Sequence, residues 1–382
     1  MKPKRIILSV TNDLVTDQRV HRSCLALHEA GYEVLLVGRH LPGSVAVNRP
    51  YKTHRMRLLF RRKALFYAEY NCRLFLKLLF SRADAFYAND TDTLMANYYA
   101  AKLRGKPLFF DAHEMFPEVP ELADRPRVKA VWTAIEDSIL PHVEHCCTVC
   151  QSIADIYRER YGVEMAVVRN VPLRRSKADA GLSPKVAGIL AQVPQGKRII
   201  LYQGAVNLGR GIEQLLEAMP LLDECHFIVA GIGDKYDSLR TYAHAHNLDD
   251  RVSFVGRLPL EELGQLTHHA QLGLSLLENR GLNYFYSLPN RIADFAQAAV
   301  PVLATDFPEI HAVVERYGIG TLIASGREND AQALVQAIRD ALGEWDGIAP
   351  EEKQRRFDRA GEELSWQHDK KILLGAVEKL WN

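Results

Sequence analysis

A glycine-rich loop with one arginine follows a short apolar run in the second half of the chain. The run 199–202 leads into Gly204, Gly209 and Gly211, and an amphipathic stretch comes after them. Glycines let a backbone approach an anion closely, and the start of a helix points unpaired N–H groups at it. Arg210 adds a guanidinium, which can bind a phosphate through two hydrogen bonds. The spacing fits neither a dinucleotide fingerprint nor a P-loop, so alone it predicts an anion site or an ordinary strand-to-helix turn.

A second stretch of this half could also hold an anion. Ser287 and Leu288 come immediately before Pro289, a residue type favoured in the first turn of a helix. A helix that begins at Pro289 would present the two preceding amides at its start. Arg291 and Asp294 would lie in its first turns. The stretch therefore predicts a second turn that could bind an anion.

Polar side chains follow three apolar runs in the first half, at the point where each predicted strand ends. They are Asn12, Asp13, Arg19, Asp90, Asp111, His113 and Glu114. In open sheets, ligands bind beyond the carboxyl ends of the strands. The set indicates a polar, hydroxyl-rich ligand, because buried polar groups without partners cost about 1 to 3 kcal/mol each. For His113 alone, a hydrogen bond to a neighbouring carbonyl is an equally good explanation.

Short apolar runs alternate with longer amphipathic ones, which is typical of α/β folds with parallel sheets. We predict two Rossmann-like, doubly wound domains at residues 1–172 and 198–365. The segment 173–197 has prolines, a basic run and no sustained period, and it is predicted to be the linker. The last helix, 366–382, is expected to pack back on the first domain. The two domains are expected to face a central cleft, and the site should lie there.

The composition is that of an ordinary globular protein. The chain has 382 residues, of which 47% are hydrophobic and 25% charged, and its net charge is +1. A nearly neutral protein has no overall field that attracts nucleic acid, so we expect no nucleic-acid partner. The apolar stretch 64–80 is interrupted by charged residues and should not span a bilayer. Scattered cysteines and an N-terminus without a cleavable leader predict a cytoplasmic protein.

A cysteine cluster could supply metal ligands. It contains His145, Cys146, Cys147 and Cys150, but no second C-x2-C pair accompanies it. Structural zinc prefers four ligands, and small apolar cysteines are common in buried strands. We therefore predict core cysteines here and no metal site.

The region from Arg39 to Arg82 is strongly basic. It contains eleven Lys or Arg residues and one acidic residue, Glu69. The basic stretch runs into a helix rich in leucine and aromatic residues, a combination suited to an anionic bilayer surface. A core helix with basic side chains that extend to solvent explains the pattern equally well. The protein is thus expected to be cytoplasmic, with peripheral attachment to the inner face of the membrane as one of two alternatives.

Taken together, these residues resemble the GT-B retaining glycosyltransferases of family four, the group 1 glycosyl transferases. Six segments are similar to family motifs and occur in the family's order. They are Asn12-Asp13 with Asp17 to Val20, Asp111 to Glu114, Arg169 to Pro172, Gly204 with Arg210-Gly211, Gly231-Ile232-Gly233, and Ser287-Leu288-Pro289-Asn290-Arg291. The resemblance covers nearly the whole chain and implies transfer of a sugar from a nucleotide donor.

The resemblance also implies roles for individual residues. Gly204 and Arg210 would contact the donor diphosphate, Asp294 would hold the ribose hydroxyls, and His113 would approach the transferred sugar. The base would lie near the loop of Gly256, Arg257 and Leu258. The donor would be held mainly by the second domain, through these residues together with Gly231, Gly233 and residues 287–291. The polar set of the first domain would face the acceptor.

Two departures from the family pattern concern the charges around the donor. Ala205 stands where similar proteins often carry an arginine, and Arg210 keeps the other basic position. Tyr286 and Asp294 stand where the family tends to have a Glu-x7-Glu pair. Arg291 could replace the missing cation, because a first-turn arginine can reach a phosphate at its own helix end.

We therefore expect a metal-independent retaining glycosyltransferase whose catalytic groups are His113, Arg210 and Arg291. The donor would be a UDP- or GDP-sugar, and the acceptor a saccharide or a lipid-linked saccharide of cell-surface polysaccharide synthesis. The departures leave two alternatives: a non-catalytic relative that acts as a binding subunit, and a nucleotide-sugar epimerase of the same fold. A nicotinamide dehydrogenase is less favoured, because neither half shows G-x-G-x-x-G after its first strand.

Overall fold

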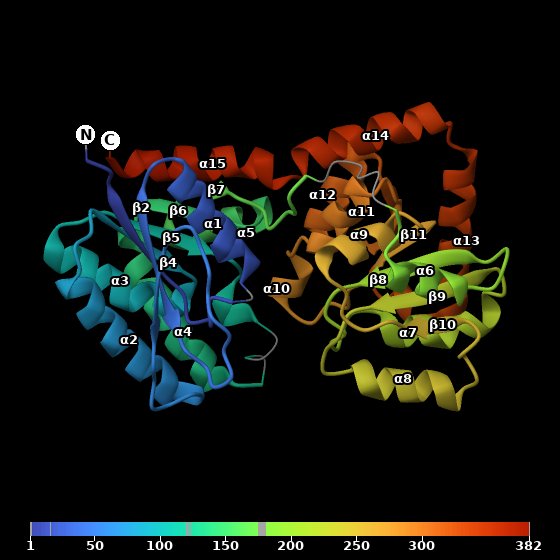
Figure 1. Ribbon diagram of the computed structural model, residues 1–382, viewed down its shortest axis with the longest axis horizontal. Helices are drawn as coiled ribbons and strands as arrows, with labels where there is room; N and C mark the ends of the chain where they lie inside the picture. The colour runs from blue at the N-terminus through green and yellow to red at the C-terminus, as the bar shows by residue number, and fades with distance from the viewer. Residues whose placement is uncertain (1, 16, 120–121, 123, 175–180, 382) are drawn as a thin grey trace. The chain divides into compact units, whose positions relative to one another are not determined.

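The computed structural model describes residues 2–15, 17–119, 122, 124–174 and 181–381. The chain divides into two compact units (Figure 1). Unit 1 comprises Met1–Asn170, Gly281–Asn283 and Asp369–Asn382, and unit 2 comprises Val171–Arg280 and Tyr284–His368. Each unit is described by itself below.

Unit 1 is built on a seven-stranded parallel sheet with the order β3-β2-β1-β4-β5-β6-β7. Its strands are β1 (Arg5–Ser9), β2 (Glu33–Arg39), β3 (Lys52–Met56), β4 (Ala85–Asn89), β5 (Leu108–Ala112), β6 (His145–Thr148) and β7 (Met165–Val167). Strands β4 and β5 are buried along their whole length, as expected where helices cover both faces of a parallel sheet.

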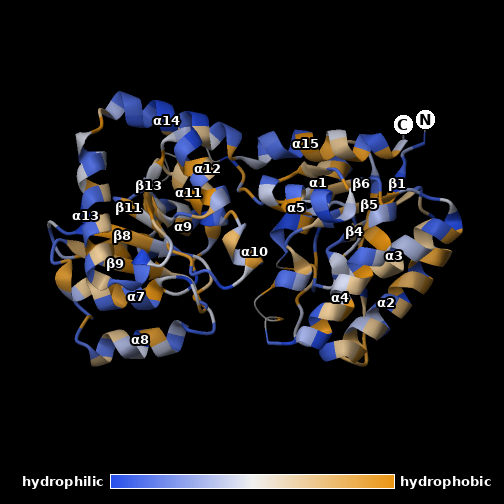
Figure 2. Ribbon diagram, turned by 180° about the vertical axis from the view of Figure 1, so that it is seen from behind, coloured by the Kyte–Doolittle hydropathy of each residue, from blue (hydrophilic) through white to orange (hydrophobic). Residues whose placement is uncertain are grey.

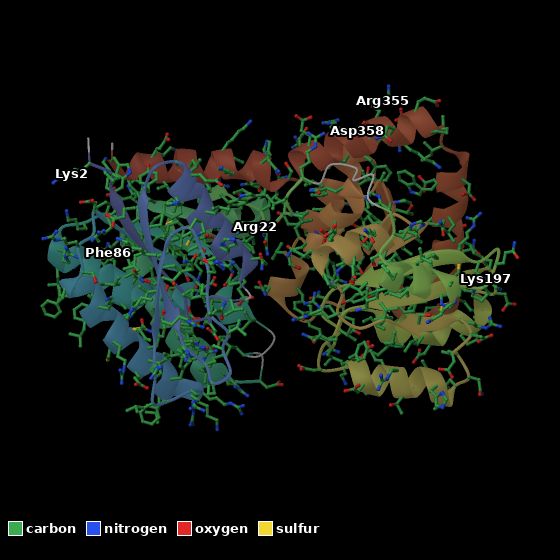
Figure 3. All side chains as sticks on the ribbon, viewed as in Figure 1. Lys2, Arg22, Phe86, Lys197, Arg355 and Asp358 are labelled. Atoms are coloured by element: carbon green, nitrogen blue, oxygen red, sulfur yellow. The ribbon has the colours of Figure 1, made fainter. Side chains whose placement is uncertain are left out.

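Helices cover both faces of this sheet, as Figure 1 shows. They are α1 (Gln18–Glu29), α2 (Lys63–Phe80), α3 (Thr91–Arg104), α4 (Pro126–Ile139), α5 (Gln151–Tyr161) and α15 (Trp366–Glu378), with short 3-10 helices at Phe116–Glu118, Leu140–His142 and Lys379–Trp381. The side chain of Asp17 caps α1 by accepting a hydrogen bond from Val20 N (3.0 Å). Figure 3 places Arg22 on this helix, where its guanidinium donates to Asn170 Oδ1 (2.5 Å).

Unit 2 has a six-stranded parallel sheet with the order β10-β9-β8-β11-β12-β13. Its strands are β8 (Arg198–Gln203), β9 (Cys225–Ala230), β10 (Val252–Phe254), β11 (Leu272–Ser275), β12 (Val302–Thr305) and β13 (Gly320–Ile323). Its helices are α6 (Pro184–Ala191), α7 (Ile212–Ala218), α8 (Tyr236–Ala245), α9 (Leu260–Thr267), α11 (Asn290–Gln297), α12 (Pro308–Tyr317), α13 (Ala331–Gly347) and α14 (Pro350–Glu363), with 3-10 helices at Met219–Leu221 and Arg327–Asn329. The short helix α10 (Leu282–Phe285) is divided between the two units, because Gly281–Asn283 are counted with unit 1.

Two hydrophobic cores lie on opposite faces of the second sheet. One joins the sheet to α11, α12 and α14, and the other joins it to α7, α8 and α13. Figure 2 shows these strands as largely hydrophobic and the outer helices as mixed. The predicted doubly wound parallel sheets are therefore confirmed in both units.

Three details differ from the expectations or extend them. The edge strand β3 was not predicted, because its sequence Lys-Thr-His-Arg-Met is polar. Residues 175–180 of the predicted linker lie outside the described residues, but α6 occupies part of the remainder, and its Val186 and Ile189 belong to the core of unit 2. The cysteines 146, 147 and 150 are buried in unit 1. Of the helices in the described ranges, none is long and apolar enough to cross a membrane.

Candidate functional site

In unit 1 the strand order reverses between β1 and β4, and polar side chains gather beyond this point. In open α/β sheets this reversal is the place where ligands bind. Thr11, which follows β1, donates a hydrogen bond to Asp92 Oδ2 at the start of α3 (2.6 Å). The buried hydroxyl group of Tyr70 donates a hydrogen bond to Val10 O (2.6 Å), just after β1. The two strand ends are thus held together as one polar edge.

His113 lies between two carboxylates at this edge. Its backbone N donates to Asp90 Oδ1 (2.7 Å), and its Nδ1 lies 3.1 Å from Asp90 Oδ2. Its Nε2 lies 3.3 Å from Asp111 Oδ2, with which it forms an ion pair. The side chain is 16% exposed. The predicted site residues His113, Asp90 and Asp111 are therefore in one cluster.

Asp90 adopts a backbone conformation that non-glycine residues rarely take, with φ 61° and ψ 165°. Such conformations cost about 1 to 3 kcal/mol and persist where the surrounding structure imposes them. Here the conformation directs the Asp90 carboxylate at both the backbone and the ring of His113. It also leaves α3 without a side-chain cap from Asp90.

The charges of this cluster set its protonation. Burial lowers the pKa of His113, but the charges of Asp90 and Asp111 outweigh it and raise the pKa to about 10. For Asp111, burial is opposed by Arg19 and His113, which hold its pKa well below the usual range. Burial and the charge of Asp90 raise the pKa of Asp92 to about 8. At neutral pH these pKa shifts favour the imidazolium form of His113 and the neutral form of Asp92.

We expect His113 to stay protonated at pH 8 and Asp90→Asn to lower its pKa, because one of its two anionic neighbours is lost. The pKa of His113 is higher in the folded protein than in the unfolded chain. Protonation of His113 therefore stabilises the fold fully below about pH 6.5, and this contribution is lost as the pH rises toward 10. Titration of the 14 histidines by ¹H–¹⁵N NMR measures the pKa of His113, and the His113→Gln variant identifies its signal. A wild-type midpoint near 6.5 would contradict this assignment.

Arg19 and Asp111 form a buried ion pair beneath His113. Arg19 Nη2 donates to Asp111 Oδ1 (2.6 Å) and Nη1 donates to Val168 O (2.8 Å). Tyr87 donates to the other carboxylate oxygen of Asp111 (2.8 Å). The side chains of Arg19 and Asp111 are 5% and 0% exposed, whereas contact with an acceptor would need exposed side chains. Both residues therefore support the site from beneath.

The other predicted acceptor-side residues belong to the surrounding loops. Asn12 donates to Asp17 Oδ2 (2.7 Å), and Asp13 accepts from Arg55 Nη1 (2.9 Å). Asp13 also accepts a hydrogen bond from Ser44. Glu114 is half-buried directly after His113. Asn12 and Asp13 therefore fix the loop after β1, whereas Glu114 extends the polar edge.

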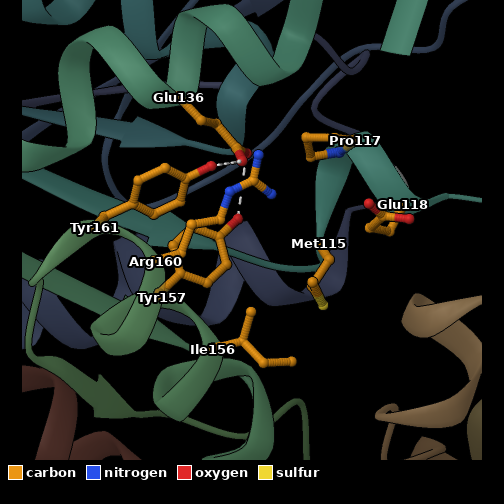
Figure 4. A pocket seen from close by; sticks show the side chains of 8 residues that line it. All are labelled: Met115, Pro117, Glu118, Glu136, Ile156, Tyr157, Arg160 and Tyr161. Atoms are coloured by element: carbon orange, nitrogen blue, oxygen red, sulfur yellow. Dashed lines mark hydrogen bonds between the residues drawn. The ribbon is translucent and has the colours of Figure 1, made fainter. Parts of the chain in front are cut away.

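A small hollow lies in unit 1 beyond the segment that follows His113 (Figure 4). Its lining residues are Met115, Pro117, Glu118, Glu136, Ile156, Tyr157, Arg160 and Tyr161. The buried carboxylate of Glu136 accepts hydrogen bonds from Thr91 (2.6 Å), Tyr157 (3.2 Å) and Tyr161 (3.1 Å). Burial raises its pKa to about 7. These three hydroxyl groups satisfy the hydrogen-bonding capacity of the Glu136 carboxylate. No sequence pattern predicted this hydrogen-bond network.

In unit 2 the glycine loop follows β8, beside the reversal of strand order between β8 and β11. A Cβ at Gly231 would collide with the carbonyl oxygen of Gly204, and one at Gly233 would collide with Asn207 and Val206. A Cβ at Gly211 would collide with Leu276, which follows β11. These glycines let three loops pack closely. Gly231 and Gly233 are thus needed for loop packing, and their predicted contact with the donor stays a prediction.

Two arginines lie beside this loop. The Arg291 side chain is directly beneath Gly204, since a Cβ there would lie 3.4 Å from Arg291 Nη2. Arg291 stacks over the ring of Tyr202 (4.3 Å to the centroid) and Arg210 over that of Tyr284 (4.7 Å). Arg291 is 7% exposed, and its Nη1, like Arg210 Nε, is buried with no hydrogen bond to any described residue. Burial, together with the charge of Arg210, lowers the pKa of Arg291.

The turn before α11 is more internal than expected. The helix begins at Asn290, with Pro289 as the residue before it, so it starts one residue later than predicted. Ser287 folds back, and its Oγ donates to Tyr284 O (3.0 Å). Leu288 packs against the core, and Asp294 is half-buried on α11. In this segment Arg291 has the clearest functional geometry.

The loop predicted to lie near the base follows β10. Gly256 has φ 69°, a conformation that favours glycine, and Arg257 is exposed. Leu258 is 7% exposed and belongs to the hydrophobic core, so only its backbone is available to a ligand. Tyr236, for which no sequence pattern gave a signal, donates to Phe254 O (3.2 Å) and holds this loop.

Comparisons with known proteins point to one group of enzymes. The family model described as "Glycosyl transferases group 1" matches residues 191–364, and "Glycosyltransferase Family 4" matches residues 17–172. The glycogen synthase of Mycobacterium tuberculosis is 24% identical over 259 residues, which are 65% of this chain. The chain spans just over half of that protein, 56% of its length.

Two solved structures share the fold over almost their whole length. Sucrose-phosphate synthase from Thermosynechococcus elongatus has a TM-score of 0.76 at 18% identity, with 99% of both chains covered. Anabaena Alr3699/HepE in complex with UDP-glucose has a TM-score of 0.70 at 14% identity, again with 99% of both chains covered. With the two parallel-sheet units, these likenesses confirm the predicted GT-B fold.

Proposed function

Because the chain belongs to the group 1 glycosyl transferases, we propose that it transfers a sugar from a UDP- or GDP-sugar to a saccharide or lipid-linked acceptor, with retention of anomeric configuration. The observation that carries the proposal is the pair of arginines, Arg210 and Arg291, beside the glycine loop. Among the described residues, Arg210 Nε and Arg291 Nη1 are buried and find no hydrogen-bond partner. Two like charges in such a position are costly unless an anion joins them. A nucleoside diphosphate supplies that anion.

The two arginines have a direct role in the chemistry. Negative charge grows on the diphosphate as the bond to the sugar breaks, and preorganised donors stabilise such charge strongly. Arg291 reaches the loop glycine from beneath, so it supplies the cation that Ala205 does not. With two guanidiniums in place, the protein's own cations neutralise the leaving diphosphate, and no metal ion is required for this step.

The His113 cluster of unit 1 fits a partner rich in hydroxyl groups. Its imidazolium is paired with Asp90 and Asp111 but remains 16% exposed, and a sugar hydroxyl or a developing oxyanion is attracted to such a positive charge. Asp90 and Glu114 add acceptors at the same edge. We assign His113 to the transferred sugar and the remaining polar edge to the acceptor. The acceptor's class, cell-surface glycan synthesis and a cytoplasmic location form part of this proposal.

Incubation with a panel of UDP-, GDP-, ADP- and dTDP-sugars tests the proposal. One donor should raise the unfolding temperature and be hydrolysed slowly to its nucleoside diphosphate, because a ligand at 100 times its dissociation constant stabilises by about 2.7 kcal/mol. Binding without hydrolysis or transfer would identify a non-catalytic relative. Conversion of the donor sugar without an acceptor would identify an epimerase. Once the acceptor is known, NMR of the product's anomeric proton tests retention.

A further inference from the structure

Helix α2 of unit 1 has two apolar faces, of which only one is buried. Its inner face packs Phe66, Tyr70, Leu74 and Leu78 against the domain. On the opposite side a stripe at helical spacing is also apolar, and it consists of Leu65, Ala68, Cys72, Leu76 and Phe80. Leu65 is 58% exposed, Leu76 53% and Phe80 82%. A core helix needs only the inner face, so burial in this domain does not explain the outer stripe.

The loop before α2 continues this apolar surface. Leu59 and Phe60 are 79% and 45% exposed. Their backbone N–H groups both donate to the carboxylate of Glu69 on α2 (2.8 to 3.0 Å). These bonds tie the loop to the helix and occupy its backbone polar groups. Two large apolar side chains are therefore held at the surface by a specific contact.

The same segment exposes basic side chains together with the apolar ones. The exposed basic residues of this segment are Arg57, Arg61, Arg62, Lys63, Arg73 and Arg82. The segment's one acid, Glu69, is occupied by the loop amides and by an ion pair with Arg73 (2.8 Å). No negative charge of this segment is thus available to the basic residues outside that pair.

We propose that residues 57–82 form a docking face for an anionic lipid bilayer, into which Leu59, Phe60, Leu65, Leu76 and Phe80 insert. A helix whose apolar stripe is flanked by Lys and Arg lies in the plane of a bilayer surface, with its apolar side chains in the acyl boundary. Anionic headgroups complement the basic rim. The inference deepens the proposed function, on which it rests for the lipid-linked acceptor, but docking itself requires no transferase activity.

Co-sedimentation of the full-length protein with vesicles tests this face. Wild type should bind vesicles of phosphatidylcholine that contain about 30% phosphatidylglycerol, and this binding should weaken as the salt concentration rises. Leu76→Ser with Phe80→Ser should reduce the partition coefficient at least tenfold while the salt dependence remains. Arg61→Gln, Arg62→Gln and Lys63→Gln together should reduce it by about 100-fold, roughly fivefold per charge, and flatten the salt dependence.

Matched controls separate this face from general surface hydrophobicity. Leu182→Ser with Leu221→Ser changes two side chains of unit 2 that are 44% and 48% exposed, and it should leave vesicle binding unchanged. Donor-induced thermal stabilisation without vesicles should be equal in all variants, so loss of docking and failure of donor binding are distinguishable.

Two results would overturn the proposal. One is equal sedimentation of wild type and both α2 variants. The other is a concentration-dependent dimer without vesicles, which Leu76→Ser with Phe80→Ser makes monomeric, because the face would then bind a second copy of this chain. Sedimentation-velocity measurements detect that dimer.

Discussion

Replacement of Arg210 by alanine is expected to lower kcat by about 10²- to 10³-fold with the true donor. This is the scale seen when one preorganised donor to a developing anion is removed. Arg210 lies over the ring of Tyr284, and its Nε is buried without a hydrogen bond to any described residue. It is therefore held in place before the donor arrives. Its interaction strengthens as charge moves onto the leaving diphosphate, so the transition state loses more than the ground state.

A variant of the same unit serves as the control for Arg210→Ala. Asp294→Ala should mainly raise the donor KM, because ribose hydroxyls do not change charge during transfer and their hydrogen bonds stabilise both states alike. Arg210→Lys keeps the charge but loses the bidentate fork, and should fall between wild type and alanine. If Arg210→Ala keeps most of its kcat, the assignment is wrong and Arg291 is the main leaving-group cation.

The sequence predicted the frame of the fold because that frame depends on local patterns. Alternating apolar and amphipathic runs predicted the parallel sheets of both units but not the edge strand β3. Strand β3 pairs with β2 at the edge of the sheet. An edge strand is partly exposed to solvent, so its side chains can be polar, and an apolar pattern is absent. Val186 and Ile189 show the converse case, because one short apolar stretch among prolines proved to be core.

The candidate site was predictable in its residue types but not in its contacts. Motif spacing selected both His113 and Arg291, yet only the fold shows that Asp90 bends to meet His113 and that Arg291 lies beneath Gly204. Close packing of loops far apart in sequence accounts for Gly231 and Gly233. Such contacts depend on tertiary structure, and no pattern along one chain encodes them. The basic region was ambiguous for the same reason, since exposure of the outer stripe of α2 is a three-dimensional fact.

Asp111→Asn is expected to reduce the free energy of unfolding of unit 1 by about 3 to 5 kcal/mol. The change keeps the shape of the side chain but leaves the guanidinium of Arg19 buried without its counter-charge, and uncompensated buried charges cost about this much. Calorimetry of the full-length protein measures the loss as a lower temperature for the transition that contains unit 1. The pKa of Asp111 is far below its usual range, so the effect should persist from pH 5 to 8.

The exposed pair at the other end of the same sheet provides the matched control. Glu33 accepts from Arg5, and both side chains are about one-third exposed. Glu33→Gln should therefore cost no more than about 1 kcal/mol. Combining Asp111→Asn with Arg19→Met should cost less than the sum of the single changes, because the stranded charge is removed. If Asp111→Asn has the same free energy of unfolding as Glu33→Gln, water must reach the guanidinium of Arg19. The ion pair would then not be what holds β5 in place beneath His113.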